Sequence, residues 1–110
     1  MAMTPEKKVK QKVVVVLKKH AAYYFYPVTG GWGSSGVPDI VACVRGHFVG
    51  IECKAGKNRP TKLQEANLDK IAECGGIALI INETNVHVLD TMLSQLGESN
   101  DYDNEINLIN

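Results

Sequence analysis

Long hydrophobic runs are missing from this chain of 110 residues. Val13 to Leu17 is an apolar run of five residues, whereas a helix that crosses a bilayer needs about 20. The run is also too short for the apolar region of a signal peptide, and no small-residue cleavage site follows it. We therefore expect neither a membrane protein nor a secreted one, but a cytoplasmic protein.

Cysteine is scarce, with three residues at positions 43, 53 and 74. An odd number leaves at least one thiol unpaired, and none of the three lies in a CxxC or a Cys/His zinc spacing. We expect all three to be reduced and mostly buried as small apolar side chains, as is usual in the cytosol. The cysteines therefore give little support for a zinc site.

Acidic residues are few in the first part of the chain. Residues 1–62 hold eleven Lys and Arg against three acids, Glu6, Asp39 and Glu52, whereas residues 63–110 hold one Lys against nine acids. The net charge of zero thus combines a basic part of +8 with an acidic part of −8. A basic part favours a phosphate-rich partner, although solvated lysines on helices and loops would give the same balance. The three acids within the basic part then need an explanation.

The pattern of apolar residues predicts two main helices and four main strands in one small domain. One helix is expected over 5–20, where Thr4 and Pro5 suit its start, and another over 61–74, where Thr61 and Gln64 form a capping box. β-branched and aromatic runs predict the strands. Their expected ranges are 22–28, 39–44, 48–54 and a buried strand over 77–81. A glycine-rich loop over 29–38, a short strand at 86–88 and a short helix at 91–96 complete the prediction.

This order, αβββαβ, predicts an α/β fold with a mixed sheet flanked by helices. The two strands around Arg45 and Gly46 must form an antiparallel hairpin, and the strand–helix–strand unit from 48 to 81 should be a right-handed parallel crossover. We expect one domain over residues 1–97 and an acidic C-terminal tail over 98–110 that frays.

The hairpin places two carboxylates opposite each other. If Arg45 and Gly46 form a two-residue turn, Asp39 pairs with Glu52 on one face of the sheet, with Cβ atoms roughly 4.5–5.5 Å apart. Lys54, two residues further on, projects to the same face. Two facing carboxylates need a compensating cation. A divalent metal such as Mg²⁺ would supply it, but Lys54 alone would also do so at an exposed end, and a longer turn would separate the acids.

Two more polar residues point toward this hairpin. Glu6 lies on the apolar stripe of the first helix, where a charge is unfavourable, and Gln64 shares a face with Leu68 and Ile71. Each has a local explanation, since Glu6 suits a helix N-terminus and Gln64 completes a capping box. Together they place four polar groups beside a basic loop.

These residues resemble a known nuclease signature. Gly36-Val37-Pro38-Asp39, followed after twelve residues by Glu52-Cys53-Lys54, resembles the PD-(D/E)xK motif. With Glu6 in an upstream helix and Gln64 in the following one, the pattern looks most like the VRR-NUC (virus-type replication-repair nuclease) family. The resemblance spans roughly Thr4 to Asn82 and implies a restriction-endonuclease-like core.

The resemblance implies a phosphodiesterase that uses Mg²⁺ or Mn²⁺. Asp39, Glu52 and the backbone carbonyl of Cys53 would ligate the metal, with Glu6 bound directly or through water. Lys54 would orient or deprotonate the attacking water, and Gln64 would position Lys54 or a phosphate. The family includes homodimeric enzymes that resolve Holliday junctions, which implies branched DNA as substrate and a bacterial or phage origin.

Further residues are candidates for contact with DNA. They are Lys57, Arg59 and Lys62, which follow the motif directly, and Trp32, which could stack on a base or anchor its loop. A structure-selective endonuclease acting on four-way junctions is the main hypothesis. A nuclease acting on flaps, forks or plain duplex, and a DNA-binding module without catalysis, are the alternatives.

Overall fold

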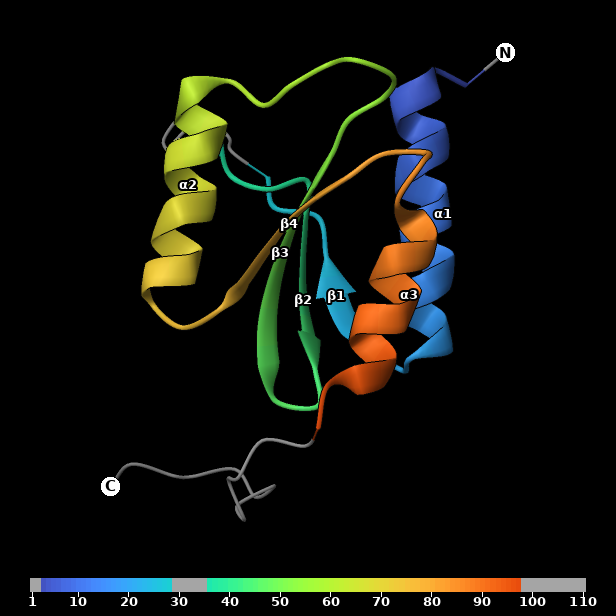
Figure 1. The fold of residues 1–110 in the computed structure, drawn as a ribbon, viewed down its shortest axis with the longest axis vertical. Helices are drawn as coiled ribbons and strands as arrows, with labels where there is room; N and C mark the ends of the chain where they lie inside the picture. The colour runs from blue at the N-terminus through green and yellow to red at the C-terminus, as the bar shows by residue number, and fades with distance from the viewer. Residues whose placement is uncertain (1–2, 29–35, 98–110) are drawn as a thin grey trace.

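The computed structural model describes residues 3–28 and 36–97, and within them helices and strands alternate as an α/β fold (Figure 1). The elements are α1 (Pro5–Lys19), β1 (Tyr23–Phe25), β2 (Ile40–Val44), β3 (His47–Cys53), α2 (Lys62–Glu73), β4 (Ile77–Ile81) and α3 (Val86–Gln95). The strands form one sheet in the order β1-β2-β3-β4. Only the β3–β4 pair of this sheet is parallel. The predicted fold class, a mixed sheet flanked by helices, is confirmed.

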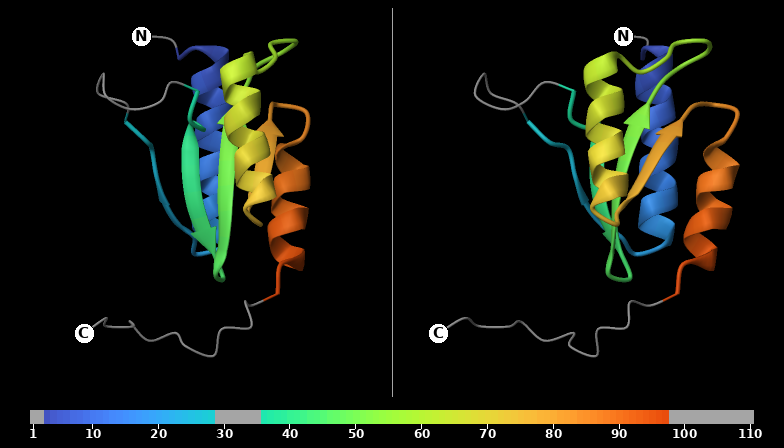
Figure 2. Two further views of the ribbon diagram at one scale, coloured as in Figure 1. Left: turned by 90° about the vertical axis from the view of Figure 1, so that its left-hand side faces the viewer. Right: turned by 60° about the vertical axis from the view of Figure 1, so that its left-hand side comes forward.

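The sheet lies between two helical layers. Helices α1 and α3 cover one face and α2 covers the other, as the views in Figures 1 and 2 show. The main core lies on the α1 and α3 side, where alternate residues of the strands are buried against three positions of α1, namely Val9, Val13 and Leu17. These three positions lie on one helical stripe, which is why the valine-rich segment forms a helix rather than a strand.

The central hairpin has the predicted register. Arg45 and Gly46 form a two-residue turn with φ angles of 47° and 84°, and Val44 pairs with His47. Positive φ at both turn residues matches the twist of the flanking strands and fixes the pairing that follows. The strand ends that carry the candidate site residues are therefore placed side by side by the turn.

Helix α2 approaches the sheet closely over Gly50 in β3. A Cβ atom at Gly50 would lie 2.6 Å from Cδ1 of Ile71 and 3.2 Å from Cγ of Pro38. The missing side chain thus lets α2 pack directly on the backbone of β3. This contact holds the C-terminal half of α2 against the middle of β3.

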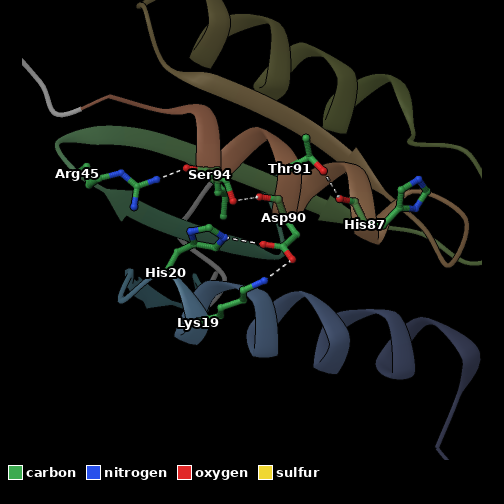
Figure 3. A network of polar contacts seen from close by, with 8 residues as sticks. Lys19, His20, Arg45, His87, Asp90, Thr91 and Ser94 are labelled. Carbon is green, nitrogen blue, oxygen red and sulfur yellow. Dashed lines mark hydrogen bonds and ion pairs between the residues drawn. The ribbon is translucent and has the colours of Figure 1, made fainter.

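The predicted strand at 86–88 was wrong, because one continuous helix, α3, runs over Val86–Gln95 and includes most of the helix predicted at 91–96. Val86, Leu89 and Leu93 recur at helical spacing and pack on the core, which decides the helical conformation. Asp90 ties α3 to the end of α1, with 2.7 Å contacts to Lys19 Nζ and His20 Nε2. Arg45 Nη2 donates to the carbonyl of Leu93 and its Nε donates to the carbonyl of Leu96 at 3.0 Å, so the hairpin turn holds the end of α3. Figure 3 shows the Asp90 contacts and Arg45 directed at this end of the helix.

Three smaller expectations are also corrected. Strand β1 spans Tyr23–Phe25 rather than 22–28. Strand β4 is only partly buried, with Ile80 44% exposed, because it is an edge strand. Cys43 and Cys74 are exposed and only Cys53 is buried, because Cys43 lies on the face of β2 opposite the main core and Cys74 caps α2.

Some predicted segments lie outside the described residues, namely most of the loop at 29–38 and the whole C-terminal tail. Across residues 3–28 and 36–97, no helix has the length and apolar character needed to cross a membrane.

Candidate active site

Asp39 stands immediately before β2, after the buried residue Pro38. Its Oδ2 accepts a hydrogen bond of 2.8 Å from the backbone N–H of Cys53 at the end of β3. This bond extends the contact between the two strands beyond Ile40 and Ile51, the last pair of the ladder. It fixes the Asp39 carboxyl group beside Glu52, as the hairpin register predicts.

Glu52 is a buried charged residue, 1% exposed, on the α2 side of β3. Its Oε1 accepts a hydrogen bond of 3.0 Å from Gln64 Nε2, whereas its Oε2 has no partner among the described residues. Burial raises the pKa of Glu52 to about 8, and the charge of Asp39 acts in the same direction. Burial and the neighbouring carboxyl group therefore both oppose ionisation of Glu52, and a bound cation would favour it.

Lys54 lies between two acids that come from different elements. Its Nζ is 3.9 Å from Oε1 of Glu52 and 3.9 Å from Oε1 of Glu6, in the first turn of α1. The Lys54 side chain is 14% exposed, whereas that of Glu6 is 47% exposed. The backbone N–H of Lys54 donates to the carbonyl of Ile81 at 3.0 Å. The lysine is thus held by the sheet at its backbone and by carboxylates at its ammonium group.

Gln64 both completes the cap of α2 and contacts Glu52. Its Oε1 accepts from the backbone N–H of Thr61 at 2.8 Å, while Thr61 Oγ1 accepts from the backbone N–H of Gln64 at 3.2 Å, which completes the capping box. Its Nε2 is then directed at Glu52. The cap of α2 therefore orients an amide donor into the site.

Cys53 contributes to the site through its backbone. Its side chain is buried in the core on the opposite face of β3, and burial, with a further contribution from the charge of Asp39, raises its pKa to about 12. A thiol with this pKa stays protonated at neutral pH and is a poor metal ligand. The side chain is therefore a core residue, as expected, and any role as a ligand falls to its carbonyl group.

A basic loop between β3 and α2 borders the site. Lys57, Arg59 and Lys62 are all exposed, and none of them forms an ion pair with a described carboxylate. A hollow of about 520 Å³ is lined by Lys57, Arg59 and the edge residue Ile80. Trp32 lies outside the described residues. The loop is thus a positively charged surface next to the carboxylates.

Glu83 is a residue of this region that the sequence did not single out. Its Oε1 accepts a hydrogen bond of 2.8 Å from the backbone N–H of Gly56, which anchors the basic loop to the segment after β4. No local motif marks Glu83, because the contact joins residues far apart in the chain.

The oxygen ligands at this site suit a metal ion that keeps most of its coordinated water molecules. Among the described residues, no three His, Cys, Asp or Glu side chains lie close enough together to enclose an ion. Mg²⁺ typically binds through one or two carboxylates, with waters and phosphate oxygens completing its coordination. The Asp39–Glu52 pair and the unpartnered Oε2 of Glu52 fit this requirement, whereas Glu6, on the far side of Lys54, fits a contact through water.

Comparison with known proteins defines the class of this protein. A solved structure described as a VRR_NUC domain matches with a TM-score of 0.68 at 15% sequence identity, covering 86% of this chain and 100% of that one. The fold is therefore that of a VRR_NUC domain.

The family follows from a second comparison. The family model described as archaeal Holliday junction resolvase (Hjc) matches residues 7–90. The chain belongs to this family and is a nuclease. No curated protein matches the sequence.

Proposed function

We propose that this protein is a metal-dependent endonuclease that resolves four-way DNA junctions as a homodimer. The observation that carries this proposal is the pair formed by buried Glu52 and half-buried Asp39 beside Lys54, at the border of an exposed basic loop. A buried acid with a raised pKa is costly for the fold and is typical of a functional site. Membership of a junction-resolvase family supports the choice of substrate.

The reaction is the hydrolysis of a DNA phosphodiester. A water molecule loses a proton as its oxygen forms a bond to phosphorus, the bond from phosphorus to one ester oxygen breaks, and that oxygen takes up a proton. In this proposal Lys54 orients the water and donates to the phosphate oxygens, where negative charge accumulates. Gln64 fixes the Glu52 carboxylate, and Glu6 holds the Lys54 ammonium group in place from the opposite side.

Mg²⁺ or Mn²⁺ is the proposed cofactor. Asp39, Glu52 and the Cys53 carbonyl would hold the ion, with Glu6 contributing through water. When bound, such an ion supplies Lewis-acid activation and neutralises charge on the phosphate. Lys57, Arg59, Lys62 and Trp32 are proposed contacts to DNA.

The dimer follows from the number of cuts that resolution requires. Resolving a four-way junction takes two cuts in opposed strands, and one such carboxyl pair is present in the described part of the chain. Two copies related by a twofold axis would present two sites to a junction with the same symmetry.

The test is cleavage of an end-labelled four-way junction, with flap and duplex DNA as comparisons, in Mg²⁺, Mn²⁺ and EDTA. We expect paired symmetric cuts in Mg²⁺ or Mn²⁺ and none in EDTA. Lys54→Ala should lower the cleavage rate about 10²-fold or more while binding is kept, because a group that handles the attacking water is lost. Lys70→Ala, an exposed lysine in the last turn of α2, is the matched control.

The dimer is tested in the same assay by mixing the two proteins. Mixed dimers of wild type and Lys54→Ala should nick one strand where wild type makes paired cuts. Cleavage of flaps or duplex in preference to junctions would overturn the substrate while keeping the chemistry. If the protein binds DNA but shows no metal-dependent cleavage of any DNA, the result would favour the alternative of a DNA-binding module without catalysis.

A further inference from the structure

A second basic surface runs along α1, away from the loop that borders the site. A hollow of about 480 Å³ lies between α1 and the segment that follows β1. Three lysines line it, Lys7, Lys10 and Lys18, together with Tyr26, Val14 and Val15. Lys10 Nζ lies 5.8 Å from the centre of the Tyr26 ring. We call this surface the α1 groove.

No described carboxylate neutralises the α1 groove. Lys19 pairs with Asp90 and Lys54 pairs with Glu6 and Glu52, but the three groove lysines form no ion pair with any carboxylate in residues 3–28 and 36–97. None of the residues that line the hollow is acidic. Lys7 and Lys18 are exposed, whereas Lys10 is half-buried against Tyr26. Three cations held on a rigid helix without counter-charges suit an anionic partner.

The groove begins at the site and leads away from it. Glu6, which contacts Lys54, is the residue before Lys7, and the groove lysines continue along the helix to Lys18. At 1.5 Å per residue the distance from Lys7 to Lys18 is roughly 16 Å. One strand of duplex DNA carries a phosphate about every 3.4 Å of its axis, so the groove spans about five base pairs. The length and continuity of the groove match a duplex that leaves the site.

We propose that the α1 groove binds the phosphate backbone of a duplex DNA arm that extends from the cleavage site. This inference rests on the proposed function for the identity of the partner. Phosphate contacts of this kind fix the position and orientation of a duplex without reading its sequence. The mixed apolar and basic lining suits the sugar–phosphate backbone, with the Lys10–Tyr26 contact holding one ammonium group in place.

The experiment compares two double variants of α1 that remove the same charge. Lys10→Gln/Lys18→Gln alters the groove, whereas Lys8→Gln/Lys12→Gln removes two exposed lysines from the side of α1 that carries Lys19 and faces α3. Binding of a labelled junction is measured in EDTA by fluorescence anisotropy over a series of salt concentrations, and cleavage is measured in Mg²⁺ at saturating DNA. The thermal midpoint of each variant checks that it folds, and Lys18→Gln alone, at an exposed position, replaces the double variant if that does not fold.

We expect the groove variant to bind on the order of 10-fold more weakly at low salt, with the slope of log affinity against log salt reduced by about 1.8, since two phosphate contacts are lost. Its cleavage rate at saturating DNA should stay within about twofold of wild type, and the control variant should bind like wild type. An equal loss of binding affinity in the two variants, or no loss in either, would overturn the proposed role of the α1 groove. Cleavage by wild type would still support the nuclease function. If wild type cleaves no DNA but the groove variant still binds DNA more weakly than wild type, the result would support DNA binding by the α1 groove and overturn the proposed nuclease function.

Discussion

At the scale of single residues, Glu52 is the buried charged residue of the described chain. The backbone of β3 directs its carboxyl group into a space closed by α2, where Gln64 supplies one hydrogen bond and Asp39 adds a second acid. In the absence of a cation this arrangement is unfavourable for an ionised carboxylate, since burial and the Asp39 charge oppose ionisation. The site therefore makes an unfavourable contribution to the free energy of the folded state, which a bound cation would offset.

This cost predicts a dependence of stability on pH. The folded-state pKa of about 8 lies above the ordinary value of 4.5, so the contribution of Glu52 to stability is fully present below the ordinary pKa and is lost as pH rises through about 8. In EDTA, wild type should lose stability relative to Glu52→Gln between acidic pH and about pH 9. The difference should reach at least about 1 kcal/mol, or roughly 4–8 °C in thermal midpoint for a domain of this size.

Thermal unfolding of both proteins across this range measures the effect. Gln keeps the shape and a carbonyl acceptor for Gln64, so the comparison isolates the titration of Glu52. Parallel curves for the two proteins would contradict the raised pKa.

At the scale of elements, the first turn of α2 joins helix formation to the site. The same Gln64 side chain completes the capping box with Thr61 and donates to Glu52. The close packing of Ile71 over Gly50 sets the distance between helix and strand. Helix α2 therefore begins at a fixed position beside β3, and for that reason its third residue, Gln64, reaches Glu52.

Removing the cap should affect both properties. Thr61→Ala loses the hydroxyl that accepts from the Gln64 backbone, which should cost about 1 kcal/mol of stability. The cleavage rate should also fall, by up to about 10²-fold, because Gln64 is no longer held in position. Thr91→Ala, which removes a hydroxyl bonded to the His87 carbonyl within α3, is the control and should change neither property appreciably (Figure 3). Loss of stability with full activity would show that Gln64 acts only as a cap.

At the scale of the whole molecule, the site joins both sides of the sheet. Glu6 comes from α1, on one face, and Gln64 comes from α2, on the other, while Asp39, Glu52 and Lys54 come from the strand ends between them (Figure 1). An ion bound at the carboxyl pair would therefore hold strands and helices together. A ligand that binds only the folded state stabilises it by mass action.

Mg²⁺ or Mn²⁺ should thus raise the thermal midpoint in a concentration-dependent way. The expected gain is about 2.7 kcal/mol at a metal concentration 100 times the dissociation constant. Asp39→Asn should abolish the gain, whereas Asp69→Asn, at an exposed position of α2, should keep it. Differential scanning calorimetry with and without EDTA measures both variants. An equal gain in wild type and Asp39→Asn would place the metal elsewhere.

The sequence by itself determined the parts that depend on neighbouring residues. The stripe of Val9, Val13 and Leu17 sets α1, the Arg45-Gly46 turn sets the hairpin register, and Thr61 sets the start of α2. Because a two-residue turn fixes every later pair, the meeting of Asp39 with Glu52 was predictable from the chain. The motif that indicated a nuclease is likewise contained in the hairpin.

Only the tertiary structure decided the contacts between distant segments. Val86–Gln95 form one helix because Leu89 and Leu93 are buried in the core, a gain that outweighs the β propensity of Val86 and Val88. Lys54 lies between Glu52 and Glu6 because α1 begins beside the C-terminal end of β3. Such contacts depend on how helices and strands pack against one another. A local sequence pattern does not predict which residues far apart in the chain become buried together.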